Sequence, residues 1–275
     1  MSREIKFSKY QGAGNDFVLI DNRDGSFDRN NYDLVQALCD RRFGIGADGL
    51  MLLQDTEGFD FEMVYYNADG GEGSMCGNGG RCIVAFARDL GIIQHKTVFL
   101  AVDGEHQATI QGDQVDLGMI DVSDVQRDGE GYVLNTGSPH YVTWTDDLQN
   151  KNVYEMGYAI RNNETYRTEG INVNFVEQEG SGYFVRTFER GVEDETLACG
   201  TGATAAAMAI SLHEGREGLL EIPIRVLGGQ LYISFHKQGQ RFTDVRLKGP
   251  AQKVFEGSYS TSPFFLIKKE TKNQG

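Results

Sequence analysis

Several features that would place a protein in a special class are scarce in this chain of 275 residues. Four cysteines are too few for a disulfide scaffold, so we expect free thiols in a reducing compartment. No apolar run approaches the roughly 20 residues of a membrane-spanning helix. The first ten residues, MSREIKFSKY, lack the apolar centre of a signal peptide. These absences predict a cytoplasmic protein.

The sequence also lacks the spacings that would indicate metal or redox chemistry. Cys76 and Cys82 are separated by five residues, so they form no CxxC pair, and no set of cysteines and histidines has zinc-site spacing. The CGNGG loop lacks the Gly-Lys-Ser/Thr of a phosphate-binding loop. A formal net charge of −14 argues against nucleic acid or an anionic membrane as a partner. We expect neither a metal nor a cofactor.

Only 4 prolines stand against 35 glycines, a balance that favours many tight turns over disorder. Short β-rich runs recur along the chain and predict a mostly strand protein. They lie at Lys6–Tyr10, Phe17–Asp21, Phe61–Tyr66, Thr97–Val102, Gln107–Gln111, Val115–Met119, Glu221–Val226, Leu231–Phe235 and Phe264–Lys268.

One half of the chain repeats the other. GEGSMCGNGGRCIVAFARDL, from Gly71, and DETLACGTGATAAAMAISL, from Asp194, share acidic residues, then Cys-Gly-x-Gly, then a helix-like run, and their cysteines lie 123 positions apart. The same offset aligns further blocks: Gly14-Asn15 with Gly137-Ser138, Leu50 with Val173, Phe61 with Phe184, and Asn67 with Arg190. We interpret this as an internal duplication; two convergent loops before two helices are the alternative.

Few helices interrupt the strands. Helices are expected at Asn31–Arg41, Arg81–Leu90 and Ala203–Leu212, and the last of these is apolar or small on nearly every side, so it must be buried all round. The predicted fold class is therefore α/β (α+β), with two pseudo-symmetric domains, each a curled, mostly antiparallel sheet around a central helix. We expect the halves at 1–120 and 121–262, with a boundary near Met119–Val125 and a C-terminal strand within 263–275 that returns to the first half.

Cys76 and Cys199 each precede a Gly-x-Gly that opens a helix. The unpaired N–H groups of a helix start lower the pKa of a thiol and bind carboxylates. Two such thiols on opposite sides of one cleft would suit inversion of a stereocentre, because one thiolate removes the α-proton and the other thiol returns a proton from the far face. Cys39 and Cys82 are interpreted as buried apolar residues.

At these residues the chain resembles the diaminopimelate epimerase family of cofactor-independent amino acid racemases. The resemblance rests on GAGNDFVLID, FGIGADGL, YNADGGEGSMCGNGGRC, TGSPHYV, INVNF and ERGVEDETLACGTGA, which span nearly the whole chain. It implies two α/β domains with the active site in the cleft between them, interconversion of LL- and meso-diaminopimelate in lysine biosynthesis, and a cytoplasmic homodimer.

The resemblance also implies residue roles. Cys76 and Cys199 would be the acid/base thiols, Glu189 would hold the reacting amino group, and His140 would line the site. The reacting carboxylate would meet the backbone N–H groups of Gly77, Asn78, Gly200 and Thr201. Asn15, Asn67, Asn172 and Arg190 would hold the rest of the substrate, with Arg190 on its distal carboxylate. Ser138 stands where the family often has asparagine, so its role is open.

The residues alone leave alternatives open. Glu189-Arg190 offers both charges that a zwitterionic substrate needs, but a surface ion pair is equally consistent with it. His140 could be a strand histidine with a satisfied partner, and Asn15 and Asn67 could be turn residues. Other candidate functions are a proline or hydroxyproline racemase, a non-catalytic amino acid binding protein and a thiol redox sensor.

Overall fold

The computed structural model describes residues 4–73 and 75–261. Within these residues the first half of the chain forms seven strands and two helices. These are β1 (Glu4–Gly12), β2 (Asn15–Asp21), α1 (Tyr32–Cys39), β3 (Gly49–Gln54), β4 (Glu62–Asn67), α2 (Gly77–Asp89), β5 (Lys96–Ala101), β6 (Gly104–Gln111) and β7 (Gln114–Gly118).

The remaining elements belong to the second half and end with the strand that returns to the first half. They are β8 (Val125–Asp128), β9 (Gly131–Asn135), β10 (Pro139–Trp144), η1 (Leu148–Asn150), α3 (Val153–Arg161), β11 (Asn172–Glu179), β12 (Gly182–Glu189), β13 (Asp194–Thr196), α4 (Gly200–His213), β14 (Gly218–Val226), β15 (Gly229–Gln238), β16 (Arg241–Pro250) and β17 (Gln252–Ser260).

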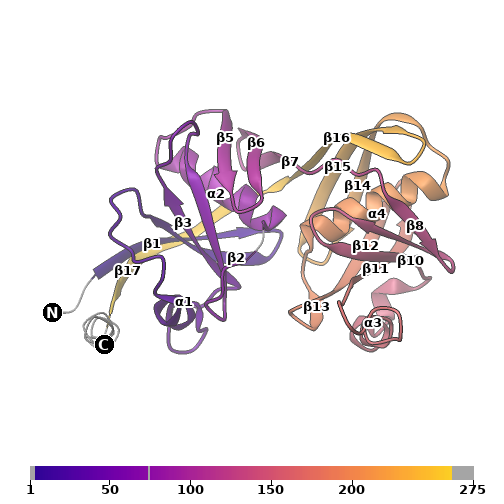
Figure 1. Cartoon of the computed structure of the whole chain (residues 1–275), viewed down its shortest axis with the longest axis horizontal. Helices are drawn as coiled ribbons and strands as arrows, with labels where there is room; N and C mark the ends of the chain where they lie inside the picture. Colours follow the sequence, from indigo (N-terminus) through magenta and orange to yellow (C-terminus); the bar gives the residue numbers. More distant parts are fainter. Residues whose placement is uncertain (1–3, 74, 262–275) are drawn as a thin grey trace.

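Each half is a curled sheet that surrounds one helix (Figure 1). In the first half the strands run β17-β1-β2-β3-β4-β5-β6-β7 around α2, with parallel pairs at β2–β3 and β4–β5. In the second half they run β8-β9-β10-β11-β12-β14-β15-β16 around α4, with parallel pairs at β10–β11 and β12–β14. The two halves thus have matching strand orders and matching parallel pairs.

The halves are joined where β7 pairs antiparallel with β16, with Leu117 opposite Leu247. β17 then crosses back and pairs with β1 along nearly its whole length (Figure 1). The returning strand therefore lies inside the range 121–262 that we expected for the second half. The strand predicted within 263–275 falls outside the described residues.

The central helices begin earlier than the sequence predicted. We expected Arg81–Leu90 and Ala203–Leu212, but α2 begins at Gly77 and α4 at Gly200, because the Gly-x-Gly residues themselves form the first turn. Small residues let both helices sit inside the curled sheets, and Ala203, Ala206 and Ile210 of α4 are wholly buried. Both Gly-x-Gly turns therefore belong to buried helix starts.

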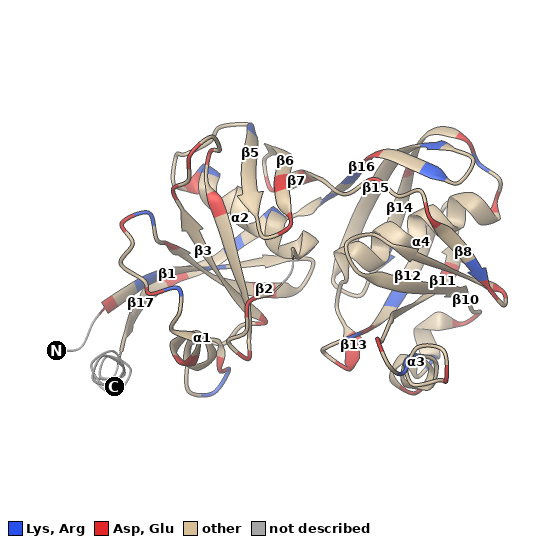
Figure 2. Cartoon of the chain, viewed as in Figure 1, with Lys and Arg blue, Asp and Glu red and all other residues tan. Residues whose placement is uncertain are grey.

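The mixed α/β class with mostly strands is confirmed, and acidic residues are spread along both halves (Figure 2). Among the described residues, none of the helices is long and apolar enough to cross a membrane. The interpretation of Cys39 and Cys82 as buried residues is also confirmed, since each packs in an apolar cluster of the first half.

Candidate active site

Cys76 and Cys199 occupy the same position at the start of a central helix. Each is the N-cap, with φ/ψ of −110°/120° at Cys76 and −112°/111° at Cys199. Both are unoxidised thiols; Cys199 is buried and Cys76 is partly buried. The duplicated sequence blocks have therefore folded into duplicated local geometry.

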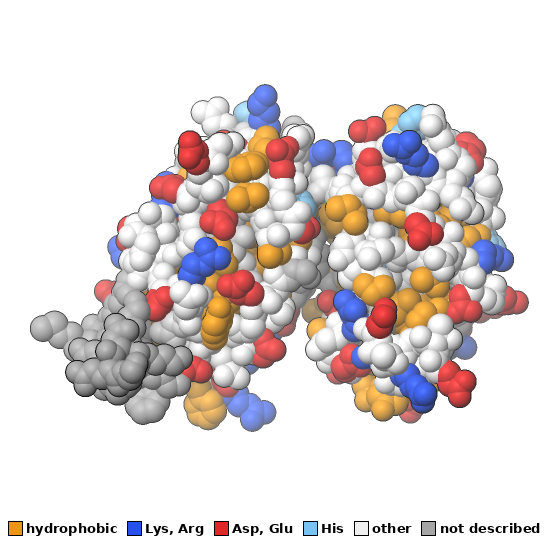
Figure 3. Space-filling model, in the orientation of Figure 1, with side chains coloured by type: hydrophobic (Ala, Val, Ile, Leu, Met, Phe, Trp, Pro, Cys, Tyr) orange, Lys and Arg blue, Asp and Glu red, His pale blue; other side chains and the backbone are white. Residues whose placement is uncertain are grey.

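The two helix starts come together at their glycines. A Cβ placed on Gly200 would lie 3.4 Å from Cα of Gly77 and 2.9 Å from Cδ2 of Leu247. A Cβ on Gly77 would likewise lie 3.7 Å from Cα of Gly200 and 2.8 Å from Cδ2 of Leu247, so the two helix starts meet beside this leucine. Asn78 adds a polar link, because its Nδ2 donates to the carbonyl of Ala198, directly before Cys199, at 2.8 Å. Both thiols therefore border the contact between the two halves, where the space-filling view shows a furrow (Figure 3).

The thiols share one electrostatic environment, but it does not favour thiolates in the way the sequence predicted. Burial raises the pKa of Cys76, and the Glu189 carboxylate adds to this, while the N–H groups of Gly79 and Asn78 lower it. Burial and Glu189 likewise raise the pKa of Cys199. The predicted net lowering of the thiol pKa values at the helix starts is wrong, because desolvation outweighs the helix N–H groups.

Asn15 lies beside Cys76. The Cys76 thiol faces Asn15 Oδ1 at 3.7 Å, and Asn78 Nδ2 faces the same oxygen at 3.4 Å. Asn15 Nδ2 in turn donates to Asp48 Oδ2 at 2.5 Å. The structure thus places Asn15 and Asn78 next to the first thiol.

Behind Asn15 lies a charged network that the sequence reasoning missed. Asp16 pairs with Lys9 at 2.7 Å and with Arg41 at 2.7 Å, and Arg41 also reaches Asp48 at 2.6 Å. Burial opposes ionisation of Asp16, but the hydrogen bonds from Arg41 and Lys9 prevail and lower its pKa to about 2. Asp48 belongs to the FGIGADGL block, so the quoted block contained a signal for this network.

A row of polar side chains leads from the second thiol through Thr201 and Ser138 to His140. Thr201 Oγ1 lies 3.5 Å from Cys199 Sγ and 3.5 Å from Ser138 Oγ. Ser138 Oγ lies 3.5 Å from His140 Nε2, so the serine stands between the threonine and the imidazole. Ser138 corresponds to Asn15 in the repeat, and both lie near the thiol of their own half.

His140 is wholly buried and its tautomer is fixed by its neighbours. Its Nδ1 lies 3.1 Å from Asn174 Nδ2, which can only donate, so Nδ1 accepts and the neutral ring carries its hydrogen on Nε2. Thr187 holds the amide in that orientation by donating to Asn174 Oδ1 at 2.9 Å. Burial, reinforced by the charge of Arg190, lowers the pKa of His140 to about 3. His140 is therefore a neutral donor toward the site.

The neutral state of His140 predicts a loss of stability in acid. A folded-state pKa below the unfolded value means that its contribution is complete above about pH 6.5 and is lost as the pH falls toward 3. Between pH 6.5 and 5, chemical denaturation should show the parent losing about 2 kcal/mol more unfolding free energy than His140→Gln. His95→Gln, which removes an exposed imidazole, is the control and should follow the parent. Equal losses in parent and His140→Gln would refute the assignment.

Glu189 is the last residue of β12, and its charge raises the pKa of both thiols. Its own pKa is raised by burial. Arg190, the next residue, is exposed and donates to the carbonyl of Glu169 at 3.1 Å. The pair is thus divided, with a carboxylate turned toward the thiols and a guanidinium at the surface, and it does not form the surface ion pair that was the alternative.

Asn172 uses its side chain on the backbone. Its Oδ1 accepts from the Arg190 N–H at 2.9 Å, and its Nδ2 donates to the Pro139 carbonyl at 2.9 Å. Asn172 therefore holds the backbone at Pro139 and at Arg190. Asn67 is exposed at the end of β4, opposite Gly49, and the described hydrogen bonds attach neither Asn67 nor Arg190 to a thiol. Both side chains are exposed, Asn67 at the end of β4 and Arg190 directly after β12.

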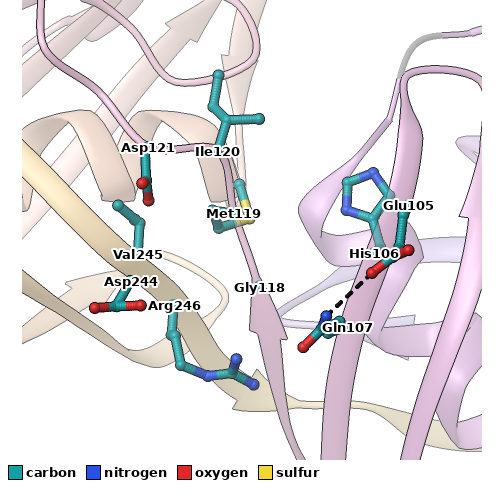
Figure 4. Close-up of a pocket in the computed structure, with 10 residues that line it drawn as sticks. All are labelled: Glu105, His106, Gln107, Gly118, Met119, Ile120, Asp121, Asp244, Val245 and Arg246. Carbon is teal, nitrogen blue, oxygen red and sulfur yellow. Dashed lines mark hydrogen bonds between the residues drawn. The ribbon is translucent and has the colours of Figure 1, made fainter.

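A separate pocket of about 370 Å³ lies where the chain crosses between the halves (Figure 4). Met119, Arg246 and His106 help to line it, and it contains none of the predicted site residues. Met119 connects it to the thiol region, because a Cβ on Gly77 would lie 3.9 Å from the Met119 methyl carbon. Within residues 4–73 and 75–261, no three His, Cys, Asp or Glu side chains form a group suited to a metal ion.

The whole chain is similar to proteins of one described family. The family model for diaminopimelate epimerase matches residues 7–122 and 132–254. The diaminopimelate epimerase of Flavobacterium psychrophilum is 52% identical over 254 residues, covering 92% of this chain and 99% of that protein. That of Chlorobaculum tepidum is 43% identical over 259 residues, covering 90% and 98%.

Solved structures with the same fold are more distant in sequence. A PhzF-family phenazine biosynthesis protein of Bacillus anthracis has a TM-score of 0.75 at 12% identity, covering 94% of this chain and 99% of that one. A hydroxyproline epimerase from Agrobacterium vitis, with bound trans-4-hydroxy-L-proline, has a TM-score of 0.69 at 13% identity, covering 95% and 94%. These likenesses concern the fold alone.

Proposed function

Because the chain belongs to the diaminopimelate epimerase family, we propose that it interconverts LL- and meso-diaminopimelate in lysine biosynthesis, with Cys76 and Cys199 as its two acid/base groups and no cofactor. The two halves would then be duplicated domains, and the active site would lie in the cleft between them. The observation that best supports this proposal is the contact at Gly77 and Gly200 between two helix starts, each with a cysteine as its N-cap.

In the proposed reaction, one sulfur as thiolate removes the α-proton of the substrate while the other, as thiol, donates a proton to the opposite face. Negative charge that leaves the α-carbon spreads into the adjacent carboxylate. The backbone N–H groups of Gly77, Asn78, Gly200 and Thr201 belong to the first turns of α2 and α4, whose positive ends suit this carboxylate. Stabilisation grows as charge develops there, which is what accelerates the step.

The raised pKa of both thiols is compatible with this chemistry. A thiolate formed next to the buried Glu189 is unfavourable until a cation neutralises the pocket. The α-ammonium of the substrate is such a cation, and Glu189 would hold it. We propose that substrate binding favours ionisation of one thiol beside the Glu189 carboxylate, so that the reactive form arises mainly in the complex.

The remaining predicted residues would bind the substrate away from the reacting carbon. Arg190 is exposed at the rim and can grip a distal carboxylate, while Asn67 lies at the end of β4. Asn15 lies beside Cys76, and Asn172 holds the Arg190 backbone, so its contribution includes positioning. His140 would donate through Nε2 near Ser138. A homodimer in the cytoplasm is part of the proposal.

The test is isotope exchange in deuterium oxide. With LL-diaminopimelate, the protein should place solvent deuterium at one α-carbon in the meso product, without added cofactor. Under the same conditions L-proline and trans-4-hydroxy-L-proline should show no exchange above the blank. Exchange with the proline substrates and none with diaminopimelate would reassign the protein to a proline-type racemase; binding of diaminopimelate with no exchange would make it a binding protein.

The redox alternative is tested by thiol chemistry. In the epimerase, reversible oxidation of Cys76 and Cys199 to a disulfide should abolish exchange, and reduction should restore it, because both sulfurs are needed in thiol or thiolate form. A gain of any activity on oxidation would favour a sensor instead.

A further inference from the structure

Arg81 is a buried cation that the proposed reaction does not yet use. It lies one turn into α2, five residues after Cys76, and its side chain is wholly buried. Two glycines make room for its head group: a Cβ on Gly249 would lie 3.2 Å from Arg81 Nε, and one on Gly12 would lie 3.4 Å from Arg81 Nη2. A buried guanidinium normally has a carboxylate partner.

Among the described residues no carboxylate forms an ion pair with Arg81. Its partners are oxygens of amides: Nη1 donates to the Gly77 carbonyl at 3.3 Å, Nη2 donates to Asn78 Oδ1 at 3.0 Å and Nε donates to the Pro250 carbonyl at 3.4 Å. The charge is therefore hydrogen-bonded but not neutralised. The nearby ionisable groups that would gain from it are the thiols Cys82 and Cys76.

The hydrogen bond to Asn78 also sets the direction of that amide. Arginine can only donate, so Asn78 presents Oδ1 to Arg81 and its NH2 group to the other side. There Nδ2 reaches the Ala198 carbonyl at 2.8 Å and Asn15 Oδ1 at 3.4 Å. One buried cation thus fixes the amide that links the first helix start to the chain before Cys199.

The repeat shows that this arrangement is one-sided. Arg81 corresponds to Thr204 at the offset of 123 positions, and Thr204 Oγ1 donates to the Gly200 carbonyl at 2.9 Å. The same carbonyl of the first helical turn is thus bound in both halves, by a cation at Gly77 and by a neutral hydroxyl at Gly200. The two thiols face matching backbones but unequal charges.

We propose that Arg81 is a positioning residue that holds Asn78 and favours the thiolate at Cys76 over the thiolate at Cys199, so that the two halves of the active site are electrostatically unequal. This deepens the proposed function and rests on it. The groups that face Cys76 are Glu189 from β12, Tyr65 from β4, Asn15 from β2 and Arg81 on its own helix. Those that face Cys199 are Glu189, Thr201 and Cys76.

Within these two sets Glu189 acts on both thiols and disfavours ionisation of each. Arg81 is the cation that acts on Cys76, and it lowers the pKa of that thiol. The buried surroundings strengthen the effect, because solvent screens a charge poorly there. Removal of the Arg81 charge should therefore raise the pKa of Cys76 and leave Cys199 nearly unchanged.

The experiment measures iodoacetamide alkylation of each active-site thiol against pH, without substrate, in full-length variants that retain only one of the two. Cys76 is followed in Cys199→Ala, and Cys199 in Cys76→Ala, with mass spectrometry of the labelled peptide. Adding Arg81→Gln should raise the apparent pKa of Cys76 by about one unit and slow its alkylation near pH 7.5 about tenfold, with Cys199 within about twofold. Thr204→Ala is the matched control and should change either rate by less than about twofold.

A second variant keeps the test decisive if Arg81→Gln does not fold. Arg81→Lys retains a cation but loses the forked hydrogen bonds, so Cys76 should be alkylated within about threefold of the parent rate. A tenfold slowing in Arg81→Lys, or equal slowing of both thiols in Arg81→Gln, would overturn the proposal. Since no substrate is present, these results are independent of the deuterium exchange that tests the function.

Discussion

Replacement of either Cys76 or Cys199 with alanine is expected to lower kcat/KM for diaminopimelate epimerisation by at least about a thousandfold. Each variant loses the acid or base on one face of the α-carbon, because the remaining thiol stands at the start of the other central helix. The measurement is the initial rate of meso-diaminopimelate formation from LL-diaminopimelate, with thermal unfolding recorded for each variant.

Cys39→Ala is the matched control for these variants. Cys39 is a buried thiol in the apolar cluster between α1 and its sheet, so its removal should leave kcat/KM within about twofold while lowering stability. A double variant of both active-site cysteines should be about as inactive as either single one, because the two sulfurs act as a unit. If Cys76→Ala or Cys199→Ala kept full activity, the two-thiol reaction would be wrong.

The largest effect on stability is expected from Gly228→Ala. Gly228 lies in the turn between β14 and β15, where its N–H donates to the Leu197 carbonyl at 2.8 Å. A Cβ at this position would lie 1.7 Å from the carbonyl oxygen of Ala13, which is backbone and cannot rotate away. The substitution should lower the free energy of unfolding by about 3 kcal/mol, measured by chemical denaturation.

The same clash lies between the halves, so activity should fall as well. Ala13 lies in the turn between β1 and β2, two residues before Asn15, and Leu197 precedes Cys199 by two residues. Gly239→Ala is the control: its φ is +62° but a Cβ there meets nothing within 4 Å, so it should lower stability by only about 1 kcal/mol and leave kcat/KM unchanged. Parent-like stability and activity in Gly228→Ala would mean that the halves do not depend on this contact.

The sequence predicted Cys76 and Cys199 as a pair because both occupy the same position in two similar segments. One Cys-Gly-x-Gly before an apolar run would have been weak evidence for a site, but two at a fixed offset, with Asn15 and Ser138 at matching places, identified equivalent points of two similar folds. The structure places Asn15 and Asn78 near Cys76, and Thr201 near Cys199.

The supporting residues could not be found in this way, since they differ between the halves. Arg81 and Thr204 bind equivalent carbonyls with unlike side chains. Asn174 orients His140 through a contact 34 residues apart in sequence, and Asp48 reaches Asn15 across 33 residues. Such pairs depend on which strands become neighbours, which local patterns do not specify.

The sign of the thiol pKa shift was predicted incorrectly for a related reason. A helix start is visible in sequence, but the extent of burial around it is a property of the assembled halves. The helix boundary differed for a similar reason: we expected a helix from Arg81, yet residues 77–80 form the first turn of α2 under the cover of the sheet. The returning strand β17 has mostly exposed side chains and so lacked the alternating pattern that marked other strands.

The proposed two-thiol reaction depends most directly on the position of the two sulfurs relative to one substrate carbon. A crystal structure with bound diaminopimelate, or with a non-reactive analogue that retains its α-carbon, carboxylate and ammonium, would measure it. We predict that Cys76 Sγ and Cys199 Sγ both lie within about 4 Å of the same α-carbon, on opposite faces. Sulfurs in separate pockets, or both on one face of the ligand, would contradict it.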